Sequence, residues 1–180
     1  MLKKILVCLD GSKFAEGLLP YAIERARHFN SKIILLKVIN SNVSTYVFSL
    51  PGMAGQPVQS VPIIAQAQLD SMIREEEVRD RLYLESVATR LRGVGLGVEV
   101  VAWRRAAGDG IGDAIVTYAA EHEVDLIIMA AHRRSFWKRF IYGSITESVI
   151  RKSSIPVLVV NPTDTEIEMV LCSVPEGELA

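Results

Sequence analysis

The residues best suited to chemistry in this chain form one short block, Gly143-Ser144-Ile145-Thr146-Glu147. A glycine followed by exposed backbone N–H groups at the positive end of a helix dipole makes a site for an anion, and the Ser144 hydroxyl can add a donor. The same block also fits a capping box, in which Ser144 and Glu147 satisfy the first helical turn without any ligand. The sequence therefore predicts a helix start here and leaves both interpretations open.

A basic turn precedes this block. Five basic or potentially basic side chains fall within it, with Phe136 and Trp137 between them: His132, Arg133, Arg134, Lys138 and Arg139. Such a turn could hold a phosphate, or it could be an ordinary solvated loop whose aromatic side chains pack against the body. One turn is too small a footprint for nucleic-acid binding in a chain of net charge −1, so we expect no nucleic-acid partner.

Asp10 follows the first apolar run and could either accept hydrogen bonds from a ligand or cap the helix that comes next. The three histidines, His28, His122 and His132, lack the spacing of metal ligands, so we infer no metal site. Neither a G-x-S-x-G elbow nor a Walker A sequence is present, and no nucleophile stands beside a base. We therefore expect no catalytic residues, and at most very slow hydrolysis of a bound nucleotide.

Composition sets the class of protein. The chain has 180 residues, of which 49% are hydrophobic and 23% charged, with 20 Lys+Arg against 21 Asp+Glu. These proportions predict one globular domain, and they exclude a polybasic arm or an acidic tail as the main feature. The longest uncharged segment, residues 38–69, contains prolines and glycines and cannot be a membrane helix. With only two cysteines, no disulfide scaffold is indicated, and we expect a cytoplasmic protein.

Five apolar runs of strand length alternate with four segments of helical spacing. The runs are residues 5–9, 33–39, 98–103, 126–130 and 157–160, and the helical segments begin near Ser12, Leu69, Ile111 and Ile145. Runs that are apolar on both faces are typical of a parallel sheet covered on both sides, so the alternation predicts a doubly wound α/β domain. Ligands bind such folds beyond the carboxyl ends of the strands, where Asp10, residues 38–40 and the turn before Gly143 meet.

Two segments fall outside this alternation. For residues 40–68 we expect a surface loop that folds over the sheet edge. Alternatively the loop is functional, because long loops without a function are uncommon in compact domains. The tail from residue 162 to residue 180 could add a strand, pack on a partner or fray.

In this order, the segments resemble the universal stress protein family over residues 1 to about 161. The matching blocks are Lys4–Ser12, Leu35–Val38, Gly108-Asp109, Val124–Met129, Gly143–Arg151 and Ile155–Val160. The resemblance implies a five-stranded parallel sheet of order 3-2-1-4-5 with helices on both faces. It also implies homodimers that pair their last strands. Here that strand is residues 157–160, an apolar edge that needs a partner or a cover.

Many members of the family bind ATP through a pattern of Gly, two residues, Gly, nine residues and Gly-Ser/Thr. Gly143-Ser144 matches the last element, whereas Ala130 and Arg133 stand where the first two glycines are expected. The Arg133 side chain could fill the phosphate space, or with Arg134 it could hold an anion. The resemblance implies ATP or AMP with Mg as ligand, bound by Asp10, Val38, Gly143, Ser144, Ile145 and Thr146.

These observations support two principal hypotheses for the function. The first is a homodimeric stress-response protein that acts through unidentified protein partners and whose nucleotide cleft is altered. The second is a nucleotide-binding module that senses ATP or AMP. A phosphorylatable receiver domain fits poorly, because it needs an acidic pair at the end of the first strand, and Leu9 precedes Asp10 there.

Overall fold

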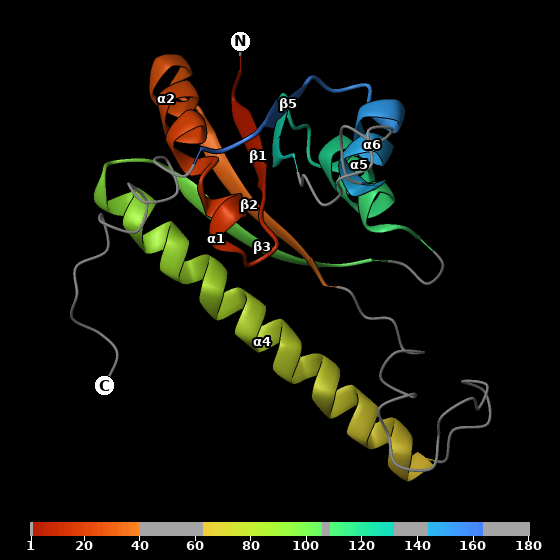
Figure 1. Ribbon diagram of the computed structural model, residues 1–180. Helices are drawn as coiled ribbons and strands as arrows, with labels where there is room; N and C mark the ends of the chain where they lie inside the picture. Colours follow the sequence, from red (N-terminus) through yellow and green to blue (C-terminus); the bar gives the residue numbers. More distant parts are fainter. Residues whose placement is uncertain (1, 40–62, 106–108, 132–143, 164–180) are drawn as a thin grey trace.

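A sheet of five parallel strands forms the centre of the molecule, in the order β3-β2-β1-β4-β5. The computed structural model describes residues 2–39, 63–105, 109–131 and 144–163. The strands, shown in Figure 1, are β1 (Lys4–Cys8), β2 (Lys32–Ile39), β3 (Val98–Arg104), β4 (Leu126–Ala130) and β5 (Val157–Val160). The five apolar runs are thus confirmed as strands, in the strand order that the family resemblance implied.

Helices cover both faces of the sheet. On one face lie α1 (Lys13–Glu16), α2 (Leu19–Phe29) and α4 (Ile63–Gly93), and on the other lie α5 (Ile111–Glu121) and α6 (Ser144–Lys152) (Figure 1). Successive residues of β1 point to opposite faces: Ile5 and Val7 join the core with α1, α2 and α4, and Leu6 joins the core with α5 and α6. Two buried faces explain why the strands carry no polar alternation.

The first helical segment differs from the single helix that its periodicity predicts. The Ser12 hydroxyl accepts a hydrogen bond from the Ala15 N–H at 3.1 Å, which confirms Ser12 as an N-cap. The helix stops at Glu16, however, and α2 begins at Leu19. Pro20 accounts for the break, because it has no N–H to donate to the Glu16 carbonyl.

The second helical segment begins earlier than its charged pattern predicts. Helix α4 starts at Ile63 rather than at Leu69, so residues 63–68 belong to a helix and the prediction of a loop over 40–68 is wrong for them. Alanine and glutamine are good helix formers, but this stretch lacks the charges that mark the polar face further along. The end at Gly93 agrees with the sequence. Residues 40–62 and the tail from residue 164 lie outside the described residues.

A group of hydrogen bonds holds the sheet together where its parallel strands begin, at their amino-terminal ends. We refer to this group as the N-edge clamp. Asp125 accepts hydrogen bonds from the backbone N–H groups of Lys3 at 2.6 Å and Lys4 at 2.9 Å. The Lys4 ammonium donates to the His122 carbonyl at 2.8 Å, and the Ser31 hydroxyl donates to the Leu2 carbonyl at 2.7 Å. The N–H groups of Lys4 and Lys3 lower the pKa of Asp125 because they stabilise its ionised form.

Helices α5 and α6 approach closely at a glycine. A Cβ built on Gly112 would lie 2.7 Å from the Ser148 Cβ and 3.3 Å from the Ile145 carbonyl oxygen. One turn further along, the Lys152 ammonium pairs with the Asp113 carboxylate. Gly112 thus sets the spacing of the two helices, and with it the position of the α6 N-terminus.

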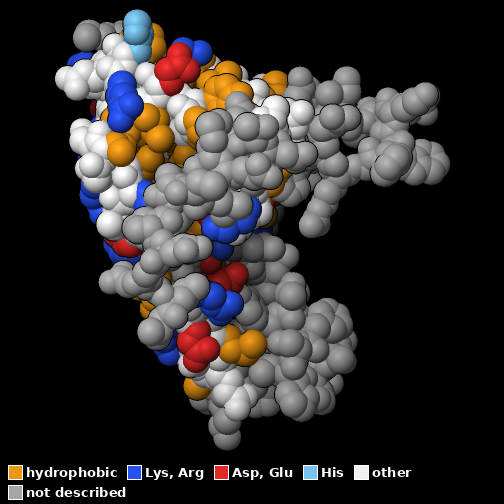
Figure 2. Space-filling model, turned by 60° about the vertical axis from the view of Figure 1, so that its left-hand side comes forward, with side chains coloured by type: hydrophobic (Ala, Val, Ile, Leu, Met, Phe, Trp, Pro, Cys, Tyr) orange, Lys and Arg blue, Asp and Glu red, His pale blue; other side chains and the backbone are white. Residues whose placement is uncertain are grey.

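Charges of both signs are mixed on the described part of one face of the molecule (Figure 2). On the face shown in Figure 2, Lys and Arg side chains alternate with Asp and Glu side chains among apolar ones. This pattern differs from the continuous basic stripe with which proteins follow a phosphate backbone. None of the helices in the described ranges combines the length and the apolar character that a membrane crossing needs.

Candidate functional site

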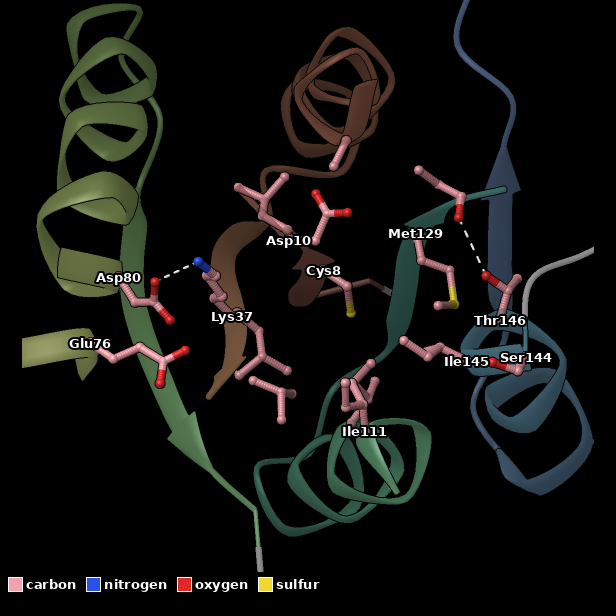
Figure 3. Close-up of a pocket in the computed structure, with 16 residues that line it drawn as sticks. Cys8, Asp10, Lys37, Glu76, Asp80, Ile111, Met129, Ser144, Ile145 and Thr146 are labelled. Carbon is pink, nitrogen blue, oxygen red and sulfur yellow. Dashed lines mark hydrogen bonds and ion pairs between the residues drawn. The ribbon is translucent and has the colours of Figure 1, made fainter. Parts of the chain in front are cut away.

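A cavity of about 580 Å³ lies beyond the carboxyl ends of β1, β2 and β4 (Figure 3). Its volume falls in the range of small-molecule and cofactor sites. The chain leaves β1 toward β2 on one side and returns to β4 on the other, so the cavity sits where the strand order reverses, as expected for this class of fold. Its lining comes from β1, β2 and β4, from α1, α4, α5 and α6, and from the turn after β1: Cys8, Leu9, Asp10, Ala15, Leu36, Lys37, Val38, Glu76, Asp80, Ile111, Ile115, Met129, Ala130, Ser144, Ile145 and Thr146.

Asp10 is held at the cavity by the turn after β1. Its Oδ1 accepts a hydrogen bond from the Ser12 N–H at 2.8 Å, and Gly11 between them has a φ of +91°, which only glycine adopts without strain. The two interpretations of Asp10 are therefore compatible: one carboxylate oxygen shapes the turn, while the residue lines the cavity.

The N-terminus of α6 forms the opposite wall. Ser144 is the first helical residue, and Ser144, Ile145 and Thr146 all line the cavity. Glu147 pairs with Arg151 at 3.5 Å along the outside of the helix. A capping box would instead place Ser144 before the first turn with Glu147 folded back on it, so the structure does not form the capping box that the sequence allowed.

Thr146 has a positioning role. Its side chain is buried, and its hydroxyl donates to the Ala130 carbonyl at 3.3 Å. This hydrogen bond fixes the first turn of α6 against the end of β4. Ala130, which replaces the first glycine of the family pattern, lines the cavity. Gly143, Arg133 and Arg134 lie outside the described residues, so their predicted contacts stay predictions.

Helix α4 contributes a charged wall that the sequence reasoning missed. The Lys37 ammonium on β2 contacts Asp80 Oδ1 at 2.5 Å, and Glu76 lies one turn before Asp80 on the same face of α4 (Figure 3). The signal in the sequence was Lys37 itself. A lysine inside a buried apolar strand needs a carboxylate partner, and two acids four residues apart on the next helix could supply it.

Burial changes two pKa values in the cavity. It raises the pKa of the Cys8 thiol to about 12, so the thiol stays protonated and is a poor nucleophile at neutral pH. Burial also raises the pKa of Glu76, with a further contribution from Asp80 and opposing ones from Lys37 and Arg79. Across the described ranges, no group of three or more His, Cys, Asp or Glu side chains is placed to hold a metal ion. The Cys8 thiol therefore lines the cavity as a neutral group.

Known proteins share this fold. The AMP-bound structure of a universal stress protein family protein from Arabidopsis thaliana has a TM-score of 0.58 at 13% identity, covering 91% of this chain and 94% of that one. UspA from Lactobacillus plantarum has a TM-score of 0.67 at 17% identity, covering 89% and 98%. At these identities the likeness establishes a common fold.

A nearer relative extends the likeness to sequence. Universal stress protein MJ0577 from Methanocaldococcus jannaschii is 34% identical over 168 residues, which span 89% of this chain and 95% of that protein. Its solved structure has a TM-score of 0.59 and covers 91% of this chain and 99% of that one. The model of the universal stress protein family matches residues 1–161. A match of that extent, with a relative of that identity, shows that the chain belongs to the universal stress protein family.

Proposed function

We propose that this chain is a nucleotide-binding universal stress protein that holds ATP or AMP in the cavity and acts as a sensor. One observation carries the proposal: Asp10, Val38 and Ser144, which are distant in sequence, line one cavity of about 580 Å³. The described residues leave this cavity between them although Ala130 stands in place of a glycine. This favours the second of the two hypotheses over a cleft that has lost its ligand.

Three parts of the cavity wall suit the three parts of a nucleotide: its phosphates, its ribose and its base. The α6 N-terminus, with the Ser144 hydroxyl, suits the phosphates, because backbone N–H groups and the helix dipole favour negative charge there. The Asp10 carboxylate suits the ribose hydroxyls, which are hydrogen-bond donors. Val38 suits the base, which needs apolar contact. The AMP-bound Arabidopsis protein supports the proposal to the extent that its fold accommodates such a ligand.

The side chains in the cavity support a sensor role over catalysis. Cys8 is protonated at neutral pH, and Lys37 is engaged with Asp80, so neither residue is set up for covalent chemistry. Magnesium would enter with the phosphates of ATP rather than through a protein site. We infer that bound nucleotide changes what the protein contacts and that turnover is negligible.

Titration of Asp10→Asn tests nucleotide binding. Asparagine keeps the oxygen that accepts from the Ser12 N–H but loses the charge, so the affinity for AMP and for MgATP should fall about tenfold. Isothermal calorimetry on wild type and variant measures this change. Asp70→Asn, on the exposed side of α4, is the matched control and should bind as the wild type does. Absence of binding to the wild type at millimolar nucleotide would refute the proposal and leave protein interactions as the function.

We propose further that the protein is a homodimer through the edge of β5. The Pro156 and Val160 carbonyls accept hydrogen bonds from β4, and backbone groups alternate in direction along a strand. Val157 and Val159 therefore turn their backbone N–H and C=O groups away from β4, toward the side of β5 where the described residues place no further strand. A second copy of β5 can pair there, which would protect the exposed edge.

Val159→Pro tests the dimer. Proline removes an outward-facing N–H and leaves the bonds to β4 in place, so we expect the dissociation constant of the dimer to rise at least tenfold. Val159→Ala is the control, because it loses the same side-chain packing but keeps the N–H. Light scattering coupled to size-exclusion chromatography measures both. A wild-type protein that stays monomeric at about 100 μM would contradict the β5 interface. So would a Val159→Pro variant that dimerises as tightly as Val159→Ala.

A further inference from the structure

The α4 wall of the cavity carries two carboxylates on one helical face. Asp80 is anchored: its side chain is 6% exposed, and Oδ1 contacts the Lys37 ammonium at 2.5 Å. Glu76 lies four residues earlier and lines the cavity beside it (Figure 3). Lys37 lies 5.7 Å from the ring centroid of Tyr83, which is also on α4. The wall is therefore built, not a chance gathering of surface acids.

Each of these carboxylates has one oxygen that the protein does not satisfy. Glu76 Oε2 and Asp80 Oδ2 are shielded from solvent, and within the described residues neither has a hydrogen-bond partner. Buried acceptors without partners are costly, so a water, an ion or a ligand that completes their bonding stabilises the site. An ionised carboxylate is only an acceptor, so the missing partner has to be an N–H or O–H donor.

The position of this wall suggests which part of a nucleotide it meets. In Figure 3, Ser144 and Glu76 lie on opposite sides of the cavity, and Asp10 lies between them. A nucleotide with its phosphates at Ser144 and its ribose at Asp10 therefore extends its base toward Glu76. The raised pKa of Glu76 agrees with this, since a charge poorly solvated by water gains from a donor on the ligand.

We propose that Glu76 is a specificity residue that accepts a hydrogen bond from the exocyclic amino group of adenine, with Asp80 and Lys37 holding the wall in place. This inference rests on the proposed nucleotide-binding function. It names a helix-borne carboxylate as the group that distinguishes an amino-bearing purine from one without the amino group.

The test pairs one ligand group with one side chain. Purine riboside 5′-monophosphate differs from AMP only by a hydrogen in place of the amino group. Wild-type protein should bind AMP about tenfold more tightly than this analogue, by isothermal calorimetry. Glu76→Ala should weaken AMP about tenfold and leave the analogue unchanged, so that the ratio falls to about one. Glu75→Ala, one residue away and exposed, should keep the wild-type ratio.

The outcomes separate this inference from the function on which it rests. If Glu76→Ala weakens both ligands equally, or if wild type does not distinguish them, nucleotide binding stands and the role of Glu76 is overturned. If wild type binds neither ligand, both proposals fail. Thermal unfolding of each variant checks the fold, and Glu76→Gln, which keeps the size of the side chain, should reduce the AMP preference without changing the melting temperature.

Discussion

Replacing Arg90 with methionine should lower the free energy of unfolding by about 3 kcal/mol, because it leaves a buried carboxylate without its main partner. Glu16, on α1, has a side chain that is only 3% exposed, and its Oε2 contacts Arg90 on α4 at 2.5 Å. Lys13 contacts the same carboxylate at 3.6 Å, but its side chain is 60% exposed and cannot replace Arg90. Chemical denaturation at neutral pH measures the loss.

Two companion variants decide whether the buried charge is the cause. Glu16→Leu combined with Arg90→Met replaces the pair by apolar groups and should recover most of the lost stability. Arg92→Met breaks an ion pair with Glu85 in which both side chains are 44% exposed, so it should cost less than about 1 kcal/mol. Equal losses from Arg90→Met and Arg92→Met would refute the argument.

Gly112→Ala should lower the free energy of unfolding by about 1–2 kcal/mol, even though alanine favours a helix by about 1 kcal/mol over glycine. The new methyl group would meet Ser148 at 2.7 Å and the Ile145 carbonyl oxygen at 3.3 Å. Relieving the contact pushes α6 outward and displaces Ser144 from the cavity, so nucleotide affinity should fall with stability. Thermal unfolding and calorimetry report the two effects.

The control for Gly112→Ala is a background in which its effect on the free energy of unfolding should change sign. In a Ser148→Gly background the first obstacle is gone, and Gly112→Ala should then stabilise the protein by about 0.5 kcal/mol through helix propensity. Gly97→Ala, where nothing lies within 4 Å of the new Cβ, should show no packing cost. If Gly112→Ala destabilises both backgrounds equally, the helix contact is not the cause.

Much of the fold follows from the sequence because its strands are apolar on both faces. The runs at 126–130 and 157–160 coincide with β4 and β5 residue for residue. The errors have local causes. Pro20 signalled the break between α1 and α2 but was outweighed by helical periodicity, and the start of α4 at Ile63 was hidden by a stretch without charges.

The sequence predicts one side of the candidate site and misses the other. Asp10, Val38 and Ser144 stand at strand or helix ends, where this fold places its ligands, and the family resemblance implies the same residues. Glu76 and Asp80 stand in a helix rich in charged residues, and spacing alone does not say which acids face inward. Only the packing of α4 beside β2 brings them to Lys37.

The N-edge clamp lies at the end of the sheet opposite the cavity. Strand β1 runs from Lys4 to Cys8, so about 13 Å separates the hydrogen bonds at Asp125 from the cavity lining. That distance exceeds the Debye length of about 8 Å at physiological ionic strength and the range over which substitutions usually interact. Changes at the two ends should therefore be thermodynamically additive, which lets the strength of the scaffold and the chemistry of the pocket vary separately in evolution or in the laboratory.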